Sequence, residues 1–87
     1  MTRDSVVDRV LVIVMRMAGP ARTPPDAGPD TPLGDGGFWL DSVDLVEVIV
    51  ACEHEFTLGF EGETDLTKDA LATSRTLADL VSAKGAR

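Results

Sequence analysis

The chain has 87 residues, which is enough for one small domain and too few for a two-domain enzyme. Hydrophobic residues make up 44% of it, but only three phenylalanines and one tryptophan are aromatic, so an aliphatic core of packed helices is favoured over aromatic-rich strands. Fifteen acidic residues against eight basic ones give a net charge of −7. Such a surface repels nucleic-acid phosphates and steers the chain toward basic protein surfaces.

The first predicted helix covers residues 5–17. Asp4 and Ser5 can cap its first turn and place a carboxylate near its positive end. Gly19 and Pro20 end it, because proline has no backbone N–H and disfavours a helical residue before it. The apolar positions that repeat at helical spacing are Val7, Val10, Leu11, Val14 and Met17.

A long first loop is predicted over residues 19–40, where all five prolines and five of the eight glycines fall. A loop of this length inside a small domain tends to be functional, and a flexible linker is the alternative. The end of the loop is apolar enough to fold back as a lid over the helices. The residues expected in this lid are Leu33, Phe38, Trp39 and Leu40.

The second predicted helix covers residues 42–57, ends before Gly59 and carries two apolar stripes. One stripe, with helical spacing, is expected to face the core and consists of Leu45, Val48, Ile49, Cys52 and Phe56. The other lies about 100° away, alternates with acids and consists of Val43, Val46 and Val50 with Asp44, Glu47 and Glu53. So small a domain can hardly bury both stripes, so we interpret the second as a partner-binding surface. The alternative is a helix packed on two sides.

Two further helices complete the prediction, a short one over residues 65–72 and a final one over residues 74–84. Thr73 or Ser74 can cap the final helix, and Lys84 before Gly85 suits its end. The core positions expected there are Leu77, Leu80 and Val81. We therefore predict a single all-α domain over residues 1–87, a small bundle of three main helices plus one short helix with a long first loop.

Ser42 is the residue with the clearest chemical potential. It follows Asp41 and opens a helix, so a phosphodiester formed on its hydroxyl would lie where backbone amides and the helix dipole favour an anion. A serine at this place is also among the best helix caps, and an Asp-Ser pair alone is usually a cap.

The segment from Leu40 to Phe56, LDSVDLVEVIVACEHEF, resembles the signature of acyl carrier proteins, an Asp-Ser-Leu opening followed by an acidic aliphatic helix. The resemblance extends to the Pro/Gly-rich first loop and to the approach to the last helix at Leu71-Ala72-Thr73. The chain departs from the pattern at three positions. Val43 replaces the usual leucine, Leu71 replaces the usual phenylalanine, and His54 occupies a position where the family often has an acidic residue. A large aromatic residue such as Trp39, three residues before Ser42, is also not typical of the family. We favour a lid over the core as its role rather than contact with an arm or a partner. The positions that match the central motif are Asp41, Ser42, Asp44, Val46, Glu47, Ala51, Glu53, Glu55 and Phe56.

This resemblance implies that Ser42, flanked by Asp41 and Val43, carries a 4′-phosphopantetheine arm taken from coenzyme A by a phosphopantetheinyl transferase. The arm would hold acyl groups as thioesters for an acyl-loading enzyme (an acyltransferase or ligase) and a ketosynthase or other downstream enzyme. The composition and the unusual loop favour polyketide or related specialised biosynthesis over fatty-acid synthesis. The positions that the resemblance assigns to partner binding are Val43, Asp44, Val46, Glu47, Val50 and Glu53.

Other classes of function remain as alternatives. A peptidyl or aminoacyl carrier usually has Gly-Gly directly before its serine, whereas Gly36-Gly37 are separated from Ser42 by Phe-Trp-Leu-Asp. An unmodified helical adaptor would need the stripes of the second helix but no serine. An enzyme is not expected, because His54 is the sole histidine and Cys52 falls on the core stripe.

The same residues bear on the compartment. Cys52 is the only cysteine, so neither an intramolecular disulfide nor a cysteine-based zinc site can form. The apolar stretch 6–18 contains three charged residues and is too short to cross a bilayer core of about 30 Å, and no signal-peptide cleavage pattern follows it. We expect a cytoplasmic monomer with no metal, nucleic-acid or membrane partner.

Overall fold

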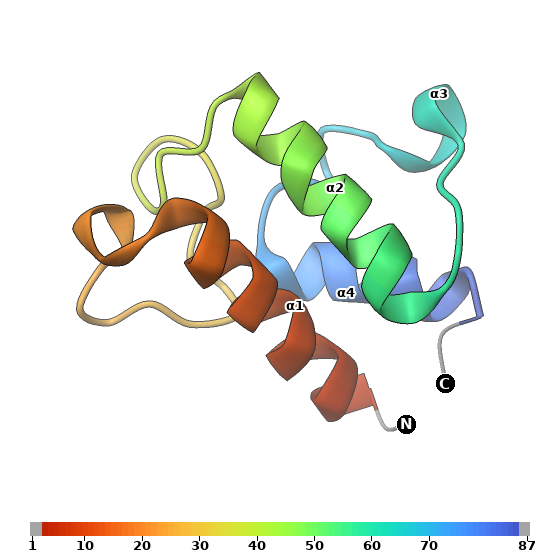
Figure 1. The fold of residues 1–87 in the computed structure, drawn as a ribbon, viewed down its shortest axis with the longest axis horizontal. Coiled ribbons are helices and arrows are strands. Elements are labelled where there is room, and N and C mark those ends of the chain that lie inside the picture. The colour runs from red at the N-terminus through yellow and green to blue at the C-terminus, as the bar shows by residue number, and fades with distance from the viewer. Residues whose placement is uncertain (1–2, 86–87) are drawn as a thin grey trace.

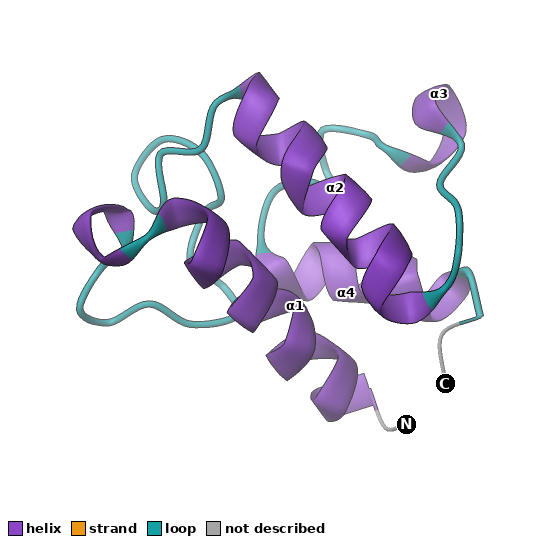
Figure 2. Cartoon of the chain, in the orientation of Figure 1, coloured by secondary structure: helices purple, strands orange, loops and turns teal. Residues whose placement is uncertain are grey.

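The computed structural model describes residues 3–85, so residues 1, 2, 86 and 87 of the expected domain lie outside the described residues. The predicted all-α bundle is confirmed within this range, which contains no strand and only an isolated bridge between Pro32 and Thr73. None of its helices is both long enough and apolar enough to cross a bilayer. The helices are α1 (Arg3–Ala18), the 3-10 turn η1 (Pro20–Arg22), α2 (Ser42–Phe56), α3 (Gly62–Asp65) and α4 (Ser74–Ala83), as Figures 1 and 2 show.

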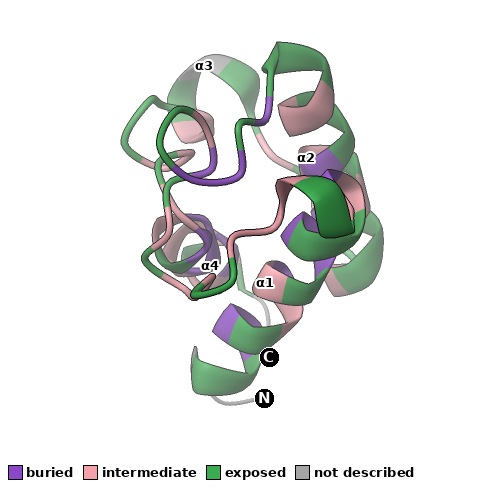
Figure 3. Cartoon of the chain, turned by 90° about the vertical axis from the view of Figure 1, so that its left-hand side faces the viewer, coloured by how far each residue is buried: buried purple, intermediate pink, exposed green. Residues whose placement is uncertain are grey.

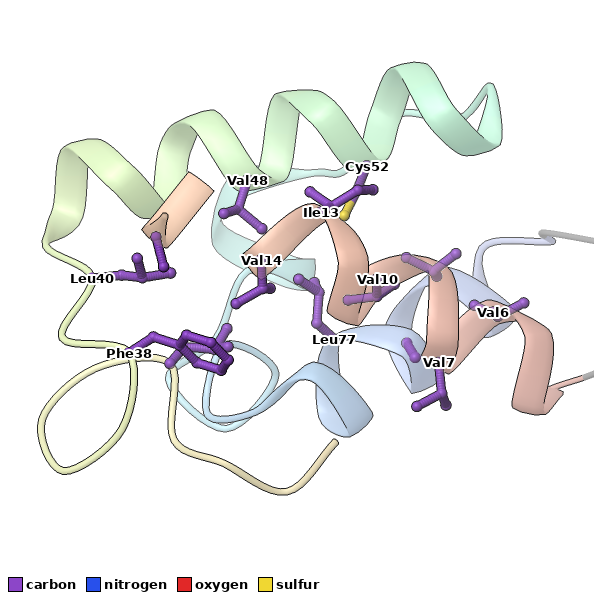
Figure 4. Close-up of a cluster of buried hydrophobic side chains, with 14 residues drawn as sticks. Val6, Val7, Val10, Ile13, Val14, Phe38, Leu40, Val48, Cys52 and Leu77 are labelled. Carbon is purple, nitrogen blue, oxygen red and sulfur yellow. The ribbon is translucent and has the colours of Figure 1, made fainter. Parts of the chain in front are cut away.

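Helix α1 is the central helix of the bundle, because it packs against both α2 and α4 (Figure 1). Its inner face buries Val10 and Val14, to which α2 adds Val48 and Cys52 and α4 adds Leu77, each fully buried. Figure 4 shows these side chains converging between the three helices. The predicted core stripe of α2 thus faces inward, with Leu45, Ile49 and Phe56 half-buried at its margins.

Local hydrogen bonds explain where α2 begins and ends. Asp41, and not Ser42, is the N-cap: its Oδ1 accepts the N–H of Asp44 at 2.8 Å, and Asp44 Oδ2 accepts the N–H of Asp41 at 3.1 Å. Thr57 adopts a left-handed conformation with φ of 52° and so stops the helix at Phe56, one residue before the predicted end.

The predicted short helix over residues 65–72 is wrong. The structure places α3 earlier, at Gly62–Asp65, and residues 66–73 are irregular, with a turn at residues 68–71. The N–H groups of Ala70 and Leu71 both donate to Thr67, to its Oγ1 and its carbonyl, at 3.1 Å, and so form a single turn. The turn cannot continue as a helix, because Thr73 is extended as the N-cap of α4 and the carbonyl of Ala72 accepts the N–H of Leu33. Lys84 at the end of α4 forms an ion pair with Asp65 at 2.9 Å, which fixes α3 against the last helix.

The first loop is a bonded lid and not a flexible linker. The N–H of Leu33 donates to the carbonyl of Ala72 at 2.9 Å, and Arg75 donates two hydrogen bonds to the carboxylate of Asp30 at 2.7 and 3.1 Å. Phe38 is fully buried under the helices (Figure 4). The expected role of Trp39 in this lid is wrong, because its side chain is 60% exposed.

Candidate functional site

Ser42 is the first residue of α2 and is exposed. Figure 3 shows the start of α2 in the colour of exposed residues. Because Asp41 and Asp44 form the capping box, the Ser42 hydroxyl takes no part in capping. The start of a 15-residue helix carries a partial positive charge from unpaired backbone N–H groups. A hydroxyl in this position can therefore accept an anionic substituent without losing a structural hydrogen bond.

Arg22 fixes the beginning of α2 to the end of α1. Its Nη1 donates to Asp44 Oδ2 at 2.8 Å, and its Nε and Nη2 donate to the carbonyls of Ala18 and Met17 at 3.1 and 3.3 Å. The hydrogen bond from Arg22, followed by the one from the Asp41 backbone, lowers the pKa of Asp44. The loop turn η1, the end of α1 and the first turn of α2, which begins at Ser42, are therefore joined in one hydrogen-bonded cluster.

One face of α2 points away from the bundle and is mostly apolar. Val43, Val46 and Val50 are 66%, 57% and 44% exposed, and Glu47 on the same face is exposed. Their spacing of three, four and seven residues makes one continuous stripe along the helix, which begins next to Ser42. We call Val43, Val46, Glu47 and Val50 the exposed stripe.

The other acids of α2 are engaged within the fold. The carboxylate of Glu53 accepts the N–H of Phe60 at 2.9 Å and so holds the turn after the helix. Asp44 forms an ion pair with Arg22. Glu55 forms an ion pair with Arg9, whose guanidinium also lies 4.9 Å from the centre of the Phe56 ring. Asp44 and Glu53, both assigned to partner binding from the sequence, are only partly exposed. The exposed acids closest in sequence to Ser42 are Asp35, Asp41 and Glu47.

Trp39, for which the sequence favoured a lid role rather than contact with an arm or a partner, lies exposed close to Ser42 in the sequence. Its neighbours Phe38 and Leu40 are 0% and 6% exposed, whereas its own side chain is 60% exposed. The N–H groups of Phe38 and Leu40 donate to the carbonyls of Pro32 and Leu33 at 3.0 and 2.9 Å, so the loop is held against the core on either side while the side chain between them faces out. The aromatic ring thus lies at the surface three residues before Ser42.

Neither an accessible thiol nor a metal cluster is present at this surface among the described residues. Cys52 is fully buried, and burial, with a smaller contribution from the charge of Glu53, raises the pKa of its thiol to about 12. His54 is exposed on α2, and residues 3–85 contain no group of three or more side chains able to hold a metal ion. The reactive group that the arrangement presents is the hydroxyl of Ser42.

Comparison of the chain with protein-family models, with curated proteins and with solved structures finds no match.

Proposed function

We propose that the chain is an acyl carrier protein whose Ser42 is the attachment point of a 4′-phosphopantetheine arm. The observation that carries the proposal is an exposed serine at the first position of a capped helix, with an exposed apolar stripe starting at the next residue. The arm would supply a terminal thiol that holds acyl groups as thioesters. The chain itself would catalyse nothing and would be the substrate of a phosphopantetheinyl transferase.

The surroundings of Ser42 fit a phosphodiester. The helix start favours a negative charge by about 0.3–1 kcal/mol at an exposed position, and Asp41 already satisfies the capping role. Asp41 and Asp44 lie within two residues of Ser42 in the sequence and would repel the phosphate, but Arg22 pairs with Asp44 at 2.8 Å and so offsets one of the two charges. This arginine therefore favours the modified form as well as the folded one.

The exposed stripe supports a weak and transient partner contact. It presents three valines and one acid, and a net charge of −7 on the chain speeds encounter with a basic partner surface more than it adds affinity. A carrier that must leave one enzyme for the next benefits from such a contact, since a tethered group reaches a neighbouring pocket through effective concentration. The proposed partners are the transferase, an acyl-loading enzyme and a ketosynthase or other downstream enzyme, in polyketide or related specialised biosynthesis in the cytoplasm.

Intact mass spectrometry tests the proposal directly. Incubation with coenzyme A and a broad-specificity phosphopantetheinyl transferase should add the mass of one phosphopantetheine group to the wild-type chain. Ser42→Ala should stay unmodified, whereas Ser5→Ala, which removes another exposed serine near a helix start, should gain the mass. A wild-type chain that gains no mass would favour an unmodified adaptor, and loading with an amino acid in place of an acyl group would favour a peptidyl carrier.

A further inference from the structure

Trp39 combines an exposed aromatic ring with an unfavourable backbone conformation. Its φ of 57° lies in the left-handed region, which is unusual for a bulky residue because the Cβ approaches the following carbonyl oxygen. Glycine or asparagine would make the same turn at lower cost. The indole does not recover this cost through burial, because it is 60% exposed.

The chain around Trp39 is held firmly in this conformation. The N–H groups of Phe38, Trp39 and Leu40 donate to the carbonyls of Pro32, Gly34 and Leu33 at 3.0, 2.9 and 2.9 Å. Phe38 and Leu40 are buried in the core on either side (Figure 4). The surrounding structure thus fixes the backbone, and strain that persists in this way is typical of functional sites.

We propose that Trp39 is a specificity residue for the phosphopantetheinyl transferase that modifies Ser42, with its indole entering an apolar pocket bordered by basic side chains. The inference rests on the function proposed above. Trp39 lies three positions before Ser42, so their Cα atoms lie at most about 11 Å apart. A standard interface covers about 800 Å² per partner, or a disc of about 16 Å radius. The exposed indole of Trp39 is therefore within reach of an enzyme bound at the Ser42 hydroxyl.

The charges beside Trp39 and its fixed backbone indicate what kind of pocket the enzyme would present. Exposed carboxylates at Asp35 and Asp41 flank Trp39 in the sequence, which favours arginine or lysine on the partner, and such cations also bind the face of an indole. A ring whose backbone is already fixed loses little entropy on binding. Tryptophan in this setting is a typical binding hot spot.

Kinetics of modification test the proposal. Trp39→Gly should lower kcat/KM for modification of the apo-protein tenfold or more, whereas Trp39→Phe, which keeps an aromatic ring, should stay within about threefold of wild type. Val12→Ala, which trims another exposed apolar side chain on α1, should leave the rate unchanged. Modification of Trp39→Gly at the wild-type rate would overturn the inference while leaving the proposed function intact. A wild-type chain that gains no mass would instead defeat the proposed function.

Thermal stability and fluorescence distinguish recognition by the transferase from two other roles of the indole, which are stabilising the fold and covering the arm. Trp39→Gly should melt at the wild-type temperature or a few degrees above it, because it relieves backbone strain. A clear drop would show that the indole stabilises the fold and would overturn the inference.

Trp39 is the only tryptophan of the chain, so its fluorescence reports on this site alone. Acrylamide quenching should decrease when the transferase is added to the Ser42→Ala variant, which binds without turnover. If quenching decreases in the modified protein without transferase, and not on transferase binding, the ring packs against the arm, and the inference is overturned.

Discussion

Two valines of α2 offer a matched test of the exposed stripe. Val46 is 57% exposed and Val48 is fully buried, although they are the same residue two positions apart and point about 200° apart around the helix. Val48→Asp removes a buried side chain worth about 1.5–3 kcal/mol and buries a carboxylate without a partner, which adds several kcal/mol. This loss approaches the whole stability of a small domain, about 5–15 kcal/mol. Val46→Asp at the surface should change stability by about 0.5 kcal/mol or less.

Thermal melting by circular dichroism, together with the rate of Ser42 modification, reads out the difference. For a domain of this size 1 kcal/mol corresponds to about 4–8 °C in Tm, so Val46→Asp should melt within about 4 °C of wild type and Val48→Asp should be largely unfolded. Folded Val46→Asp should nevertheless be modified more slowly, because a charge replaces an apolar contact. Equal drops in Tm for both variants would place Val46 in the core and remove the exposed stripe from the proposed function.

Four further substitutions test the packing and charges around the site. Glu47→Lys should slow modification at low salt with little change in Tm, whereas Glu53→Lys should lower Tm because it breaks the bond to the turn after α2. Gly37→Ala should destabilise the lid measurably in thermal melts, since a Cβ there would collide with the backbone of Pro32. The pKa of Asp44 is lowered in the folded state from its ordinary value of 3.8, so its contribution is complete above that value and is lost as pH falls through the folded pKa. Acid titration of Tm should therefore show a smaller decrease below about pH 4 in Asp44→Asn than in wild type.

The three main helices could be predicted because their apolar residues repeat at helical spacing. In α2 the spacing also separated the inward stripe with Val48 and Cys52 from the outward one with Val46 and Val50. In α1 it found Val10 and Val14 but missed Ile13, which is also buried. The reason is that α1 contacts two helices at once, so its buried face is wider than a single stripe.

The features that could not be predicted depend on partners distant in the sequence or on local bonds. Asp44 was interpreted as a surface acid, but Arg22, 22 residues earlier, occupies its carboxylate. The helix expected over residues 65–72 competes with a turn bonded to Thr67, and propensity alone does not show which prevails. The apolar character of Trp39 favours a place in the lid, but its left-handed backbone, with φ of 57°, turns the side chain outward, and the sequence pattern does not show that conformation.

The arrangement of the helices separates stability from surface recognition. Helix α1 packs against both α2 and α4. The core therefore consists of the side chains between α1 and each of these helices, together with Phe38 of the lid. The outer face of α2 contributes little to that core, so changes at Val46 and Val48 act on different properties. Effects of substitutions at distant independent sites usually add. The cluster of Arg22 and Asp44 is different, because it joins the end of α1 to the first turn of α2 and so couples the packing of the core to the position of Ser42. Changes in this cluster are therefore expected to alter the fold and the presentation of Ser42 together, which changes on the exposed stripe do not.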